Sequence, residues 1–90
     1  MFTTTAKIAN RDASGFISKV MPFQGSNLRA EWANVGEDHC YCIYSYSTMI
    51  AYLNPVNGDA WCSPEYYSQT TSRHMGLVRR GFDALESATR

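Results

Sequence analysis

The chain has 90 residues, of which 44% are hydrophobic and 18% are charged, and these proportions favour one globular domain over a disordered chain. Eight basic residues balance eight acidic ones, so the formal net charge is zero. This balance argues against a non-specific nucleic-acid binder, which carries a positive excess, and against a DNA mimic, which carries a negative one, but it leaves local patches open.

The N-terminal part of the chain is predicted to contain one helix. Residues 1–8 are expected to be a loose arm or a short strand of a single domain that spans residues 1–90. The helix is predicted over residues 11–20, with Asn10 as its N-cap. Pro22 ends it, because the residue before a proline disfavours the α region.

The middle of the chain predicts four strands, because apolar and polar residues alternate there or β-branched and aromatic residues cluster. They are expected over residues 28–32, 39–46, 49–53 and 59–63. In the first of them, Leu28, Ala30 and Trp32 are expected to face inward. Turn residues separate the strands, and Asn57-Gly58 is the clearest of these turns.

A second helix is predicted near the C-terminus, from the Thr70-Thr71-Ser72 cap cluster to about Ala88. Its apolar stripe consists of Met75, Val78, Phe82 and Leu85. Arg73 and Arg80 fall on the opposite side. Together the elements predict an α+β fold, in which a mainly antiparallel sheet of about four strands is packed by an N-terminal and a C-terminal helix.

Five short motifs lie between Phe23 and Met75. They are Phe23-Gln24-Gly25-Ser26-Asn27-Leu28, Tyr44-Ser45-Tyr46, Ile50-Ala51, Trp61 and Tyr67-Ser68-Gln69-Thr70-Thr71-Ser72-Arg73-His74. The last follows the pattern Tyr-Ser-x-Thr-Thr-Ser-Arg/Lys-His and is the most specific. Together they resemble a family of small proteins found mainly in phage genomes. The resemblance implies a phage origin and a fold but no activity, and because members of that family end soon after the histidine, it leaves the role of this chain's C-terminal helix open.

The start of the predicted C-terminal helix is the candidate binding site. Its residues are Thr70, Thr71, Ser72, Arg73, His74 and Arg80. Free backbone amides, hydroxyl groups, the helix dipole and the basic side chains would converge there on a phosphate or carboxylate. The alternative is an N-cap with flanking surface residues, in which His74 is a hydrogen-bonded packing residue rather than a catalyst.

The three cysteines, Cys40, Cys42 and Cys62, raise the question of a zinc site completed by His39 or His74. The spacing fits poorly, because structural zinc sites usually take a ligand pair from a turn rather than from alternate positions on a flat strand. Buried free thiols are the alternative. No metal, cofactor or disulfide is therefore predicted.

The sequence predicts a binding protein rather than an enzyme, because no phosphate-binding loop, zinc-protease motif or nucleophile elbow is present. The leading hypothesis is a small phage accessory protein that binds a host or phage macromolecule, with a protein partner favoured over nucleic acid and a homodimer left open. The alternative is a nucleic-acid-binding module that uses the Arg- and His-bearing C-terminal helix and exposed tyrosines. The chain has six tyrosines, which are expected either to pack in the core with their hydroxyls at its rim or to form a binding face: Tyr41, Tyr44, Tyr46, Tyr52, Tyr66 and Tyr67.

The expected location is the cytoplasm of a host cell. Residues 1–9 lack a basic segment followed by an apolar one, and no apolar run approaches the roughly 20 residues of a membrane span. The odd number of cysteines on so short a chain is typical of a reducing compartment.

Overall fold

The computed structural model describes the backbone of residues 5–63 and 69–88 and, within the second range, the side chains of residues 72–87. The elements, in chain order, are β1 Ala6–Lys7, the 3₁₀ helix η1 Asn10–Asp12, α1 Ala13–Ser18, β2 Phe23–Gln24, β3 Leu28–Val35, β4 Asp38–Ser45, β5 Thr48–Leu53, β6 Ala60–Cys62 and α2 Gln69–Ala88.

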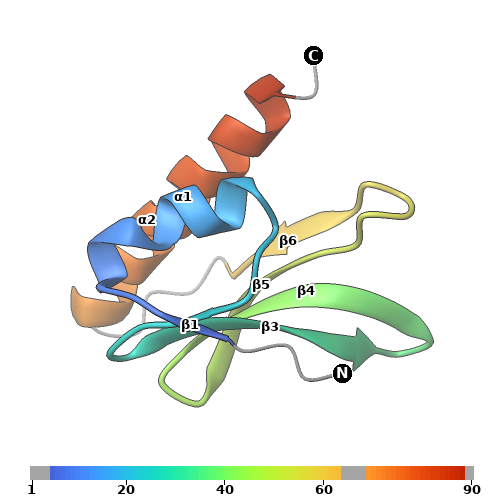
Figure 1. Cartoon of the computed structure of the whole chain (residues 1–90). Helices are drawn as coiled ribbons and strands as arrows, with labels where there is room; N and C mark the ends of the chain where they lie inside the picture. Colours follow the sequence, from blue (N-terminus) through green and yellow to red (C-terminus); the bar gives the residue numbers. More distant parts are fainter. Residues whose placement is uncertain (1–4, 64–68, 89–90) are drawn as a thin grey trace.

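The strands form one sheet in the order of the sequence, from β1 to β6. β1 pairs with β2 in parallel, and all other neighbours are antiparallel. Both α1 and α2 lie on the same side of this sheet (Figure 1). The predicted α+β fold is confirmed, but the sheet has six strands in the described part of the chain instead of about four, because the two-residue β1 and β2 extend it.

The core lies between the sheet and the helices. Alternation along β3 places Leu28 and Ala30 on the helix side, and Ala30 faces Ile43 of β4 in register. Ile43 in turn faces Ala51 of β5, and all four side chains are buried. The predicted stripe of α2 covers them: Met75 and Val78 are buried, and Phe82 and Leu85 pack partly buried against the same core.

Trp32 was predicted to face inward from β3, but it is not buried in the core, because 36% of its surface is exposed. Its ring packs edge-on against Tyr41 at 5.7 Å and stacks on His39 at 5.3 Å. β3 and β4 extend past the helices at this end of the sheet (Figure 1). The side-chain alternation is correct, but no helix lies over this position.

The two helices are packed closely together. Gly81 of α2 touches α1 so tightly that an added Cβ would lie 2.6 Å from the Ile17 side chain. The Ser14 hydroxyl of α1 donates a hydrogen bond to the Leu77 carbonyl oxygen of α2 at 2.7 Å. Neither helix is long and apolar enough to cross a lipid bilayer, in the part of the chain that the structure describes.

The predicted N-cap at Asn10 is wrong. The N-cap of α1 is Asp12, which makes no side-chain capping hydrogen bond, and Asn10 begins the preceding 3₁₀ turn. The predicted helix over residues 11–20 is otherwise present, although α1 ends at Ser18. Val20, just before Pro22, takes a left-handed φ of 55° and turns the chain toward β2.

Candidate functional site

A groove of about 450 Å³ runs between η1 and α2. Its lining residues are Asn10, Arg11, Arg73, His74, Gly76, Leu77 and Arg80. The three arginine side chains are exposed, and no carboxylate of a described residue lies within 4.0 Å of their guanidinium groups. Within the part of the chain that the structure describes, these guanidinium groups thus form no ion pair, and their positive charge attracts anions.

The groove brings together Arg73, His74 and Arg80, which the sequence placed in one candidate site. Arg11 and Asn10 join them from the other end of the chain, and sequence reasoning missed both. In the sequence, these two residues showed only that the start of the first helix is polar. Their place in the groove depends on the packing of α1 against α2, which no local pattern reveals. We call these five residues the basic groove.

The three hydroxyl residues of the candidate site do not form the predicted cap cluster. α2 begins at Gln69, so Thr70, Thr71 and Ser72 lie within its first helical positions rather than ahead of them. Ser72 is exposed. The side chains of Thr70 and Thr71 lie outside the described residues, so their predicted part in binding stays a prediction.

His74 is the buried member of the basic groove, with 3% of its surface exposed. Its Nδ1 atom lies 2.7 Å from the Ser45 hydroxyl oxygen of β4, and its Nε2 atom lies 3.5 Å from the amide nitrogen of the Asn10 side chain. The Asn10 side-chain oxygen accepts a hydrogen bond from the Ser26 backbone amide at 2.9 Å. His74 thus joins α2, β4 and η1, as expected of a hydrogen-bonded packing residue.

The Ser45, His74 and Asn10 side chains superficially suggest a catalytic triad, but their protons are arranged differently. The Asn10 amide nitrogen can only donate, so Nε2 of His74 is the acceptor and Nδ1 carries the proton of the neutral ring. Nδ1 then donates to the Ser45 hydroxyl oxygen, so His74 does not act as a base toward this hydroxyl. Burial also lowers the pKa of His74, which favours the neutral ring. These hydrogen bonds hold α2, β4 and η1 together.

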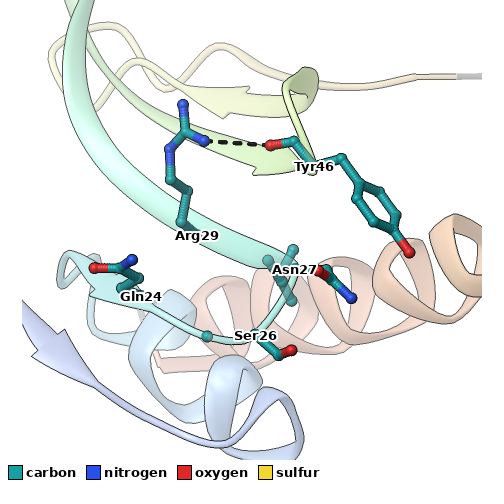
Figure 2. A pocket seen from close by; sticks show the side chains of 7 residues that line it. Gln24, Ser26, Asn27, Arg29 and Tyr46 are labelled. Atoms are coloured by element: carbon teal, nitrogen blue, oxygen red, sulfur yellow. Dashed lines mark hydrogen bonds between the residues drawn. The ribbon is translucent and has the colours of Figure 1, made fainter.

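Tyr46 lies beside the basic groove, in the tight turn between β4 and β5. Its ring is half exposed and lies 6.3 Å from the His74 ring, and its side chain points toward α2 (Figure 2). Its φ of 57° is in the left-handed region, which is uncommon for a side chain of this size. The Tyr46 amide donates to the Asn27 carbonyl oxygen at 2.8 Å, and Arg29 donates to the Tyr46 carbonyl oxygen at 3.2 Å.

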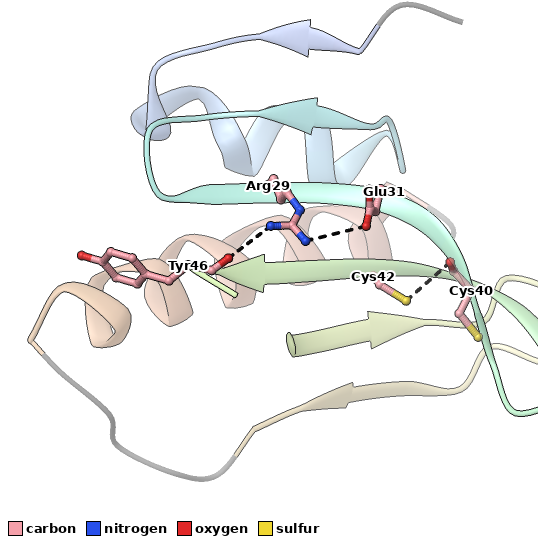
Figure 3. Close-up of polar contacts among 5 residues, drawn as sticks. All are labelled: Arg29, Glu31, Cys40, Cys42 and Tyr46. Carbon is pink, nitrogen blue, oxygen red and sulfur yellow. Dashed lines mark hydrogen bonds and ion pairs between the residues drawn. The ribbon is translucent and has the colours of Figure 1, made fainter. Parts of the chain in front are cut away.

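The three cysteines do not lie together on one face of the sheet. Cys40 and Cys42 lie on the sheet face that the helices leave uncovered, as does Arg29 (Figure 3). Cys62 faces the helix side, because it pairs with the buried Ala51, so a zinc site made by all three cysteines would have to reach through the sheet. No cluster of metal-ligating side chains occurs among the described residues. Burial raises the pKa of both Cys40 and Cys42, so these thiols stay protonated.

The uncovered sheet face carries aromatic rings that pair across strands. Tyr52 of β5 stacks with Trp61 of β6 at 5.6 Å, and the Arg29 guanidinium lies 4.5 Å from the centre of the Tyr44 ring. Tyr41 is instead buried in the core, where its hydroxyl donates to the Met21 carbonyl oxygen. The tyrosines are thus divided between core, sheet face and turn, and Tyr66 and Tyr67 lie outside the described residues.

Comparisons with known proteins place the chain without assigning an activity. Neither the curated proteins nor the solved structures contain a match to it. One family model, described as a family of unknown function (DUF8033), matches residues 3–88. The match extends from β1 to the end of α2 and so includes the whole basic groove. The chain therefore belongs to the DUF8033 family.

Proposed function

We propose that the chain is a small bacteriophage accessory protein that acts in the cytoplasm of the host cell by binding a polyanionic segment of a macromolecule, without catalysis. The phage origin rests on the motif resemblance described above. The observation that carries the binding function is the convergence of Arg11, Arg73 and Arg80 on one groove, where none of them forms an ion pair within 4.0 Å with a described residue.

The distribution of charge supports an anionic partner despite the zero net charge. The Tyr46–Ser47 turn and the Asn27 backbone meet at one end of the sheet, next to His74 and the basic groove. The acidic residues Glu37, Asp38 and Asp59 lie in or beside the turns at the opposite end. Burial first, and then the negative charges of Asp38 and Asp59, raise the pKa of the Cys40 thiol, so both carboxylates act on the same residue. These three acidic residues therefore lie away from the basic groove and do not weaken its attraction for an anion.

Two kinds of macromolecule present a polyanionic segment: an acidic stretch of protein and a nucleic acid. The sequence favoured a protein partner. The basic groove suits either partner, because guanidinium groups bind both carboxylates and phosphates bidentately. Both partners require the same arginines, so the groove can be tested first with a polyanion that represents either.

The test is the binding of fluorescein-labelled heparin, measured by anisotropy from low to high salt. Two neighbouring residues of α2 provide matched variants, because Arg79 and Arg80 are both exposed but only Arg80 lines the groove. We expect Arg80→Gln to weaken binding several-fold at low salt and to flatten the salt dependence, since each lost anion contact removes counterion release. Arg79→Gln is expected to bind like the unmodified chain.

Two outcomes would contradict the proposed function. The first is an absence of heparin binding at low salt, where contacts between arginine and an anion must be visible. The second is an equal loss of affinity in Arg79→Gln and Arg80→Gln, which would mean that total charge, and not the groove, determines binding.

A further inference from the structure

We infer that the ligand of the basic groove is a single-stranded nucleic acid, whose phosphates lie against the arginines and one of whose bases stacks on Tyr46. This inference rests on the proposed function, because it names the class of polyanion that the same groove binds. It is carried by the position and conformation of Tyr46, which polyanion binding alone does not explain.

The groove is long enough for an extended strand rather than for one small anion. Arg73 and Arg80 are seven residues apart on α2, which corresponds to about 10 Å along the helix axis. Gly76 lies between them, and an added Cβ there would meet no atom within 4 Å. No packing contact therefore requires this glycine, and its missing side chain leaves the surface between the two arginines open to a phosphate backbone.

Tyr46 supplies an aromatic surface beside His74, one of the residues that line the groove. The residue is 51% exposed, and its ring lies 6.3 Å from the ring of His74. Hydrogen bonds from both sides hold its backbone, as the Asn27 carbonyl accepts its amide proton and Arg29 donates to its carbonyl oxygen (Figure 2). A left-handed turn position favours glycine or asparagine, so a fixed, exposed tyrosine there points to a use for the ring.

A ring beside a row of arginines distinguishes between anionic partners. Bases stack on exposed aromatic side chains only when they are free of a duplex, so the combination selects single strands. An acidic protein segment would use the arginines through its carboxylates, and only an aromatic or apolar residue within it could pack on the ring. A duplex would place its phosphates on the groove while its bases remained stacked on one another.

The test compares labelled oligothymidylate, a duplex of the same length and heparin, using anisotropy at fixed low salt. We expect oligothymidylate to bind more tightly than the duplex. Tyr46→Asn suits the left-handed backbone and removes the ring, and it is expected to weaken oligothymidylate binding about tenfold while leaving heparin binding unchanged. Tyr46→Phe and Tyr46→Trp, which keep a stacking surface, are expected to retain binding.

Trp61→Leu is the matched control, because Trp61 is an exposed aromatic residue on the uncovered sheet face, away from the groove. Its oligothymidylate affinity is expected to stay unchanged. Equal affinity for single strand and duplex, or an unchanged affinity in Tyr46→Asn, would overturn the inference. So would a loss in Trp61→Leu with none in Tyr46→Asn, which would move the site to the sheet face. Heparin binding without oligothymidylate binding would refute this inference alone, whereas loss of both would refute the proposed function.

Discussion

Asn10 illustrates what single residues do in this protein. Its side-chain oxygen accepts the Ser26 amide proton, and its amide nitrogen faces His74, so it connects η1 to the turn before β3 and to α2. Gly25 is required next to it, because an added Cβ would collide with the Asn10 side chain and with the Leu28 carbonyl oxygen. The Gly-Ser-Asn turn is thus part of the framework that holds the groove's histidine in place.

The burial of His74 predicts how stability depends on pH. Burial lowers its pKa in the folded protein, so below the ordinary value of about 6.5 the unfolded chain binds a proton that the folded protein does not. Stability is therefore fully present above pH 6.5 and is lost as the pH falls from there toward the lowered folded pKa. The slope reaches at most about 1.4 kcal/mol per pH unit.

This dependence can be measured by urea unfolding between pH 7.5 and about 5.5, which is above the range in which most carboxyl groups titrate. We expect His74→Gln to remove most of the slope. The control is His39→Gln, since His39 is exposed and stacks on Trp32 at the other end of the sheet. A slope that persists in His74→Gln but disappears in His39→Gln would show that the burial argument is wrong.

At the scale of elements, the packing of α1 against α2 decides which glycines are needed. Gly81 and Gly76 lie on the same helix, and helix propensity alone predicts a gain of about 0.5–1 kcal/mol when either becomes alanine. Their surroundings differ, because a Cβ at Gly81 would lie 2.6 Å from Ile17 whereas one at Gly76 would meet nothing.

We therefore expect opposite effects of the two substitutions. Gly81→Ala should destabilise the fold by about 1–3 kcal/mol, since it forces α1 and α2 apart. Gly76→Ala should stabilise it by about 0.5–1 kcal/mol. Chemical unfolding of the two variants beside the unmodified chain tests this, and a stabilising Gly81→Ala would mean that α1 moves aside without cost.

At the scale of the whole molecule, the sheet separates two chemically distinct sides. Cys40 and Cys42 are buried on the uncovered face, where burial raises the pKa of both thiols. Cys62 lies on the helix side and is only partly buried. The three thiols therefore report on different degrees of opening of the fold.

This arrangement predicts the order of alkylation by iodoacetamide. We expect Cys62 to react first in the native protein, and Cys40 and Cys42 to react only at the rate of global unfolding, because a thiolate must form and be reached by the reagent. Mass spectrometry of partially labelled protein gives the order. If Cys42 were labelled as fast as Cys62 under native conditions, its side chain could not be buried as the structure shows.

The sequence by itself determined the elements whose patterns are local. The alternation of β3, the aromatic density of β4 and the three-to-four spacing of Met75, Val78, Phe82 and Leu85 predicted their structures, because side-chain periodicity depends only on neighbouring residues. The same spacing placed Arg73 and Arg80 together on the polar side of α2.

Only the tertiary structure decided the rest. Arg11 and Asn10 line the groove only because η1 lies beside α2 in the folded chain. Asn10 makes a long-range hydrogen bond instead of capping the helix, and Trp32 stays partly exposed. Each of these outcomes depends on contacts between residues that are distant in the chain, and no local pattern records such a contact. The physical reason is that close packing fixes which polar side chains meet and which apolar ones are covered, after the elements themselves have formed.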